Sequence, residues 1–193
     1  MRPMLEKLDG PAAVKGTMLT AHLEWAKEHL GDLEKALGPQ LSVEAAPALQ
    51  HFVLATAWFP FRTLIEIDRA IAQAAAGAPE QTYRELGRHS ADVNLLNVYQ
   101  GFVSTEPHRF FERSTLLHDR FQNFGKASYQ KVTERAGKIR MEGYTCFSPV
   151  YCATAKGYWE EALKLMHAPG PISVVESSCT CAGHPACVFD LSW

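Results

Sequence analysis

The spacing of apolar residues changes near Gly125, and this change constrains the fold more than any other feature of the sequence. Before Gly125, apolar residues recur at three- and four-residue steps, which is typical of helices, and after it the period shortens toward that of strands. We expect a mainly helical part over 1–125 and an α+β part over 126–193. Because no repeat, linker or low-complexity tract divides the 193 residues, both parts belong to a single domain, 1–193.

Five helices are predicted in the first part. Leucines from Leu19 to Leu37 follow the helical period, which Gly38-Pro39 ends. Proline favours the first position of a helix, and Ser104-Thr105-Glu106 is a capping sequence. The predicted helices cover 19–37, 44–55, the segment from Pro60 to Gly77, 79–99, and the segment that follows Glu106 and ends before Gly125.

The second part is predicted to combine strands with one helix. A hairpin turns near 135–137, and helical spacing returns over 152–166. Two strands, 172–180 and 186–193, close the chain. Cys187, Phe189, Leu191 and Trp193 share one face of the last strand. The predicted fold class is therefore α+β, with a helical N-terminal body packed on an antiparallel sheet and a C-terminal helix-hairpin unit.

Composition excludes several classes of function. The formal net charge of −2 argues against nucleic acid as a partner, because nucleic-acid binding uses a basic stripe. No window approaches ~18 consecutive apolar residues, so no membrane span is expected, and the first residues do not form a signal peptide. Five cysteines without a secretory signal favour reduced thiols in the cytoplasm over a disulfide framework.

Cysteines and one glutamate near the end of the chain have the spacing of a metal site. Glu176 precedes Cys179 by three residues, Cys187 follows eight residues later, and Cys152 begins the preceding helix. Sulfur and carboxylate ligands at these offsets can surround one tetrahedral ion, for which we predict zinc. Four protein ligands form a closed, structural site that would staple the helix to the hairpin.

One geometric condition applies to this ligand set. Residues three apart in a regular strand face opposite sides, so Glu176 and Cys179 can share an ion only if the strand ends or bulges near Ser177-Ser178. In the alternative set, His184 or Cys181 replaces Glu176. The competing interpretation is that the cysteines are simply buried apolar residues.

Three segments carry a resemblance to a known family. They are Cys152 with Gly157-Tyr158, the stretch 172–179, and the stretch 183–189. Together they resemble the 4-vinyl reductase domain family, which is related in fold to haem-nitric-oxide-binding domains and includes sensor domains of phenol-responsive bacterial activators. The N-terminal part is similar to an uncharacterised bacterial family that carries the same domain.

The resemblance implies a ligand set and a mode of action. In the sensor domains, the matching residues bind a structural zinc beside an aromatic ligand pocket, which implies zinc ligands Cys152, Glu176, Cys179 and Cys187. The gap between Cys152 and Glu176 is about one residue longer here, so Cys146 is the substitute for Cys152. The tyrosine-serine-arginine propionate clamp of the haem-binding relatives is absent from the sequence. Because no output module follows Trp193, we expect sensing to act through a protein partner or a homodimer interface.

The predicted function is a zinc-stabilised cytoplasmic domain that binds a small apolar or aromatic molecule, or acts in sensing or interaction, without catalysis of its own. Apolar pockets with few polar groups are the usual small-ligand sites. Candidate pocket residues are Trp58, Phe61, Phe110, Phe111, Tyr144, Phe147 and Tyr151, which could equally be ordinary core. The alternatives are an enzyme or accessory protein of tetrapyrrole or aromatic metabolism, and a purely dimerising scaffold.

Overall fold

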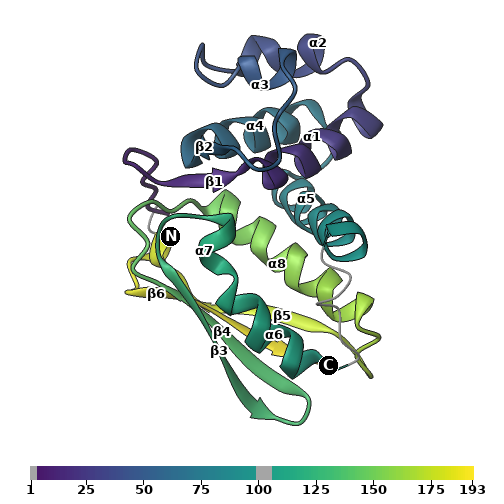
Figure 1. Ribbon diagram of the computed structural model, residues 1–193, viewed down its shortest axis with the longest axis vertical. Helices are drawn as coiled ribbons and strands as arrows, with labels where there is room; N and C mark the ends of the chain where they lie inside the picture. Colours follow the sequence, from purple (N-terminus) through teal and green to yellow (C-terminus); the bar gives the residue numbers. More distant parts are fainter. Residues whose placement is uncertain (1–3, 99–105) are drawn as a thin grey trace.

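The computed structural model describes residues 4–98 and 106–193, with the N-terminal helices gathered at one end and a four-stranded sheet, with the later helices beside it, at the other (Figure 1). The helices and helical turns are α1 (Gly16–Leu30), α2 (Leu33–Leu37), η1 (Gly38–Gln40), α3 (Pro47–Gln50), α4 (Phe61–Ala74), α5 (Pro79–Val93), the π-helical η2 (Asn94–Val98), α6 (Pro107–Leu116), α7 (His118–Phe121), α8 (Pro149–Leu165) and η4 (Thr180–Ala182). The strands are β1 (Ala13–Lys15), β2 (Trp58–Pro60), β3 (Lys126–Thr133), β4 (Ala136–Glu142), β5 (Ser173–Ser178) and β6 (Ala186–Ser192). The α+β prediction is confirmed.

The larger sheet has the strand order β3-β4-β6-β5, and every neighbouring pair is antiparallel. Cys187, Phe189 and Leu191 alternate along β6 as buried residues, as the sequence period predicted. They pack with residues of α6 and α8 in one core cluster. A second, two-stranded sheet pairs β1 with β2, and the sequence analysis did not anticipate it.

The N-terminal helices differ from their prediction in two places. The helix predicted over 19–37 divides into α1 and α2, because Gly31 between them has a φ of 75°, a backbone conformation that ends an α-helix. The helix predicted over 44–55 is reduced to the single turn α3. Some apolar residues of this segment lie outside the core; Phe52, for example, is 90% exposed. The capping residues Ser104 and Thr105 lie outside the described part of the chain.

Helices α5 and α8 cross at very short range and join the helical part to the sheet. A Cβ atom built on Gly87 would lie 1.9 Å from the carbonyl oxygen of Thr154, and one built on Gly157 would lie 1.9 Å from that of Arg84. Only glycine permits such an approach of two backbones. Glu160 on α8 also accepts hydrogen bonds from Arg84 and Arg88 of α5. The crossing therefore fixes α8 between α5 and the sheet (Figure 1).

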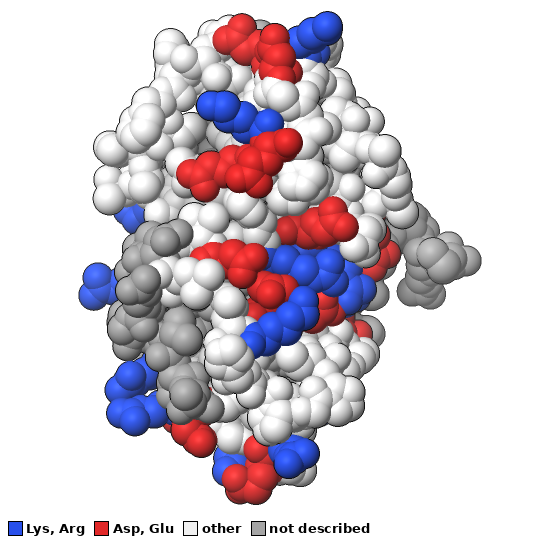
Figure 2. Space-filling view, turned by 90° about the vertical axis from the view of Figure 1, so that its right-hand side faces the viewer, with Lys and Arg blue, Asp and Glu red and all other residues white. Residues whose placement is uncertain are grey.

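Basic and acidic side chains are mixed on the face that Figure 2 presents. Ion pairs join several of the charges on α5 and α8, among them Arg88 with Glu160 at 2.8 Å and Lys164 with Glu161 at 2.7 Å. This face therefore lacks the basic stripe that nucleic-acid binding requires. Across residues 4–98 and 106–193, every helix is too short or too polar to cross a membrane.

Candidate functional site

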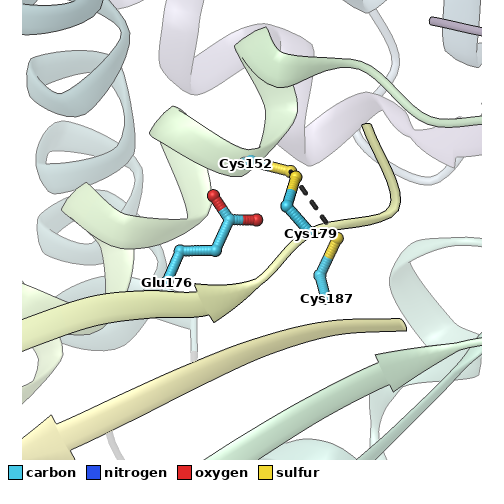
Figure 3. Close-up of side chains that lie close together, drawn as sticks. All are labelled: Cys152, Glu176, Cys179 and Cys187. Carbon is cyan, nitrogen blue, oxygen red and sulfur yellow. Dashed lines mark hydrogen bonds between the residues drawn. The ribbon is translucent and has the colours of Figure 1, made fainter. Parts of the chain in front are cut away.

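The predicted cysteine and glutamate side chains converge between α8 and the β5–β6 hairpin (Figure 3). One ligand atom each from Cys152, Glu176, Cys179 and Cys187 lies within 4.8 Å of all the others. The Sγ atom of Cys152 is 3.8 Å from that of Cys179 and 3.8 Å from that of Cys187. The three cysteines are buried, and the carboxylate approaches them from β5. The chain thus brings three thiols and one carboxyl into a single cluster.

Local structure explains how these side chains meet. Ser148 caps α8 by accepting a hydrogen bond from the N–H of Val150, and Pro149 occupies the first helical position, so that Cys152 falls in the first turn. The register between β5 and β6 shifts between Glu176 and Ser178. This irregularity meets the condition set by the sequence, because one extra residue turns Glu176 and Cys179 to the same side.

The electrostatics of the cluster disfavour negative charge. Burial is the main cause that raises the pKa of Glu176, and its Oε1 atom is buried without a hydrogen-bond partner among the described residues. Hydrogen bonds with the thiol of Cys179, and then with those of Cys181 and Cys187, raise the pKa of Cys152. A cation placed among these groups would reverse both effects, since it stabilises carboxylate and thiolate.

The alternative ligands lie differently. His184 accepts a hydrogen bond from the N–H of Cys179 at its Nδ1 atom, so this ring braces the hairpin. Cys146 lies in the other core cluster, with its Sγ atom 3.4 Å from the carbonyl oxygen of Asp9. Cys181 adjoins the four residues, and hydrogen bonds from Cys152 and Cys179 lower its pKa to about 5, but it is outside the group that meets within 4.8 Å.

A separate cavity of about 150 Å³ lies among α1, α5, α6, α8 and the β3–β4 strands. Its walls are largely apolar and include Leu95, Phe110, Met141 and Trp159. No Lys, Arg, Asp or Glu among the described residues lines it. The cavity can accept a small uncharged molecule, because apolar walls with a few polar groups characterise small-ligand sites.

The predicted aromatic residues are divided among several environments. Phe110 and Tyr151 line the larger cavity, whereas Tyr144, Phe147 and Tyr151 line a much smaller one beside Cys152 and Cys187. Phe61 and Phe111 are fully buried core residues that line neither cavity. Trp58 is 44% exposed on β2, with the Lys15 ammonium 4.0 Å from its ring centroid. The structure therefore does not gather the seven residues at one place.

The sequence analysis missed a buried pair beside the larger cavity. His22 on α1 and Asp68 on α4 are joined by a 2.6 Å contact between Nδ1 and Oδ1, and each side chain is 1% exposed. His22 also lines the cavity. The available signal was a polar residue within each apolar helical stripe. His22 lies three residues after Leu19 and four before Ala26, and Asp68 lies four residues after Leu64 and three before Ile71.

Comparison with known proteins defines the fold. No known sequence family and no curated protein sequence matches the chain. Among solved structures, an H-NOX protein from S. oneidensis in the Fe(II)NO ligation state superposes with a TM-score of 0.66 and 13% sequence identity, over 92% of this chain and 98% of that one. An unliganded Fe(II) H-NOX mutant from K. algicida gives a TM-score of 0.67 at 10% identity, over 92% and 95%.

A further solved structure, from work on haem distortion in the H-NOX family, gives a TM-score of 0.70 at 12% identity over 93% of this chain and 94% of that one. The chain therefore has the H-NOX fold, which agrees with the relationship to haem-nitric-oxide-binding domains that the sequence resemblance implied. The comparisons do not show membership of the 4-vinyl reductase family.

The comparisons contradict zinc as the predicted cofactor. Four of the solved structures that share this fold are named for haem or for the ligation state of iron, and none of these four names refers to zinc. The zinc prediction rested on ligand spacing and on a resemblance confined to residues 152–189. Spacing alone identifies residues that can meet, and it does not identify the cofactor of a fold.

Proposed function

We propose that this chain is a sensory domain that binds a small apolar molecule and catalyses no reaction of its own. The observation that carries the proposal is the apolar cavity of about 150 Å³ where the helical part meets the sheet. An apolar cavity of about this volume is large enough for a benzene-sized molecule. The H-NOX fold supports a sensory role, because proteins of that fold hold a ligand-binding iron in their solved structures.

Haem is the cofactor that the fold implies, and the residues at the cavity do not fit it. Sites for drug-sized ligands occupy about 300–1,000 Å³, and a porphyrin needs at least that much space, whereas this cavity measures about 150 Å³. Haem also carries two carboxylates, yet no Lys or Arg of the described residues lines the cavity. A histidine, His22, is present as a possible axial ligand, but the space and the charge around it favour a smaller, uncharged molecule.

Filling the cavity tests this proposal. Ala155 on α8 lines the cavity, so Ala155→Leu should occupy part of the volume and displace a ligand. In isothermal titration with benzene-sized compounds, we expect measurable binding to the unchanged protein and at least a tenfold loss in the variant. Ala76→Leu is the control, because Ala76 is exposed outside the cavity. Binding that is equal in all three proteins, or absent from the unchanged protein, would contradict the proposal.

We propose in addition that Cys152, Glu176, Cys179 and Cys187 bind a metal ion whose identity is left open. The support is the chemistry of the donor set: three sulfurs and a carboxyl oxygen meet within 4.8 Å, and Glu176 Oε1 lacks any other partner among the described residues. Four protein ligands form a closed shell without a position for substrate. The ion would therefore stabilise the joint between α8 and the β5–β6 hairpin.

The remaining predictions about context stay proposals. These are a cytoplasmic location, a homodimer or protein partner, and a single domain whose mainly helical part is 1–125 and whose α+β part is 126–193. The alternatives of an enzyme and of a dimerising scaffold stay open beside them. The molar mass in solution, measured by light scattering, separates a monomer from a dimer.

A further inference from the structure

Three buried polar atoms without hydrogen-bond partners belong to residues that line the large cavity. They are the Nε2 atom of His22, the Oγ atom of Ser90 and the Nε1 atom of Trp159, each unpartnered among the described residues. They come from α1, α5 and α8, so three elements converge on one space. Buried polar groups are normally satisfied, and an exception calls for an explanation such as an absent ligand.

Two of the three residues are more than nine-tenths buried. His22 is 1% exposed and Ser90 is 5% exposed, so neither can reach bulk water for a partner. Two other polar residues at the cavity are already engaged: Ser114 donates to the carbonyl oxygen of Phe111, and Gln122 donates to the hydroxyl of Tyr144.

All three groups can act as hydrogen-bond donors. The indole Nε1–H of Trp159 can only donate, and the hydroxyl of Ser90 can rotate to donate. For His22 the role depends on its buried partner Asp68, which holds Nδ1 at 2.6 Å. Burial, opposed by the charge of His22 and its hydrogen bond, raises the pKa of Asp68, so a net negative charge on the pair is disfavoured.

When His22 and Asp68 together carry no net charge, Nε2 of His22 is protonated, whether the shared proton lies on Asp68 or on the ring. If Asp68 is protonated, it donates to Nδ1, and the neutral ring carries its own proton on Nε2. If the proton has moved to the ring, both ring nitrogens carry protons. The residues that line the cavity thus combine apolar side chains with N–H and O–H donors, and no Lys, Arg, Asp or Glu among the described residues lines it.

We propose that His22, Ser90 and Trp159 form a recognition site for an acceptor oxygen, and that the ligand is an uncharged, ring-sized carbonyl compound. A carbonyl oxygen has two lone pairs and can accept from two of the donors at once, while the ring fills the apolar volume. This inference rests on the proposed function and makes it more specific, because it states which small molecules the cavity should select.

Acetophenone and α-methylstyrene test the inference, because they differ in replacing C=O by C=CH₂ at nearly constant shape. In isothermal titration, the unchanged protein should bind acetophenone at least about tenfold more tightly, the equivalent of one to two net hydrogen bonds. Ser90→Ala and Trp159→Phe should each lower that preference, measured as the ratio of the two affinities within the same variant, by about two- to tenfold. Ser114→Ala is the matched control, since the Ser114 hydroxyl is already bonded to Phe111, and it should keep the full preference.

His22 needs a paired substitution, because replacing it alone would leave Asp68 buried without its partner. The double variant His22→Leu/Asp68→Leu removes both polar groups and should lower the preference for acetophenone by about two- to tenfold, because Ser90 and Trp159 still donate. Equal affinities in the unchanged protein would overturn the inference and leave the proposed function standing. Failure of the unchanged protein to bind either compound would overturn the inference, and retained cavity binding of other apolar compounds would then decide the proposed function separately.

Discussion

At the scale of single residues, Gly157 and Gly87 allow α5 and α8 to touch backbone to backbone. Each hypothetical Cβ would come within 1.9 Å of a carbonyl oxygen on the facing helix, which is far inside contact distance. The obstacle is backbone, which cannot rotate away as a side chain can. These two positions therefore determine how closely the helical part approaches the sheet, and with it the shape of the cavity that α5 and α8 both line.

Gly157→Ala should destabilise the protein by about 1–3 kcal/mol, because overpacking forces the backbones apart. Urea unfolding followed by circular dichroism measures this loss. Gly38→Ala is the control: Gly38 has helical φ and ψ, and no atom lies within 4 Å of its hypothetical Cβ, so this change should be neutral or slightly stabilising. Equal stability of Gly157→Ala and the unchanged protein would show that the helices can separate at little cost.

Residue chemistry also explains what the sequence could not reveal. The offsets among Cys152, Glu176, Cys179 and Cys187 indicated a cluster because ligands for one ion come from short, recurring spacings. His22 and Asp68 carry no such signal, because they are 46 residues apart and meet only through helix packing. The same holds for Ser90 and Trp159, which are ordinary residues until the cavity is known.

At the scale of elements, prediction succeeded where one local pattern decides the outcome. The hairpin of β3 and β4, the helix α4 and the buried face of β6 follow from periodicity and turn residues. The helix predicted over 44–55 was wrong apart from one turn. Short helices depend on tertiary contacts, and packing does not support the helical propensity of this segment. The shared ion required the strand to end or bulge near Ser177-Ser178, and the β5–β6 pairing has a register shift between Glu176 and Ser178.

The bulge in β5 near Ser177 leads to a testable prediction about metal binding by the cysteine and glutamate cluster. Co²⁺ added to the metal-free protein should give thiolate-to-cobalt absorption in the near ultraviolet, and at 100 times its dissociation constant it should stabilise the fold by about 2.7 kcal/mol. Deleting Ser177 should abolish both effects, because removing the extra residue turns Glu176 and Cys179 to opposite faces. Cys187→Ser should do the same, whereas Cys146→Ser, in the other core cluster, should retain both. Co²⁺ spectra that are unchanged by Cys187→Ser would exclude this ligand set.

At the scale of the whole molecule, the fold and its cavity point to different conclusions about the cofactor. The chain covers 94–99% of several H-NOX structures at TM-scores of 0.67–0.70, yet the identity is only 10–13%. At such identity a shared fold fixes the arrangement of helices and sheet and leaves the side chains of the site free to differ. The described lining here provides donors and apolar walls but no cation for a propionate.

We therefore expect that the purified protein will not form a stoichiometric haem complex. Haemin titrated into the protein should leave the Soret absorption of free haemin essentially unshifted and should not raise the melting temperature, because the cavity of about 150 Å³ cannot enclose a porphyrin without displacing the elements that surround it. A haem-binding H-NOX protein treated in the same way is the positive control.

A complex of one haem per chain, with a Soret shift that disappears in His22→Leu/Asp68→Leu, would contradict this expectation and would identify His22 as the ligand of the iron. A weak complex that survives that double variant would instead indicate binding at the surface, because among the described residues His22 is the histidine that both lines the cavity and has an unpartnered ring nitrogen.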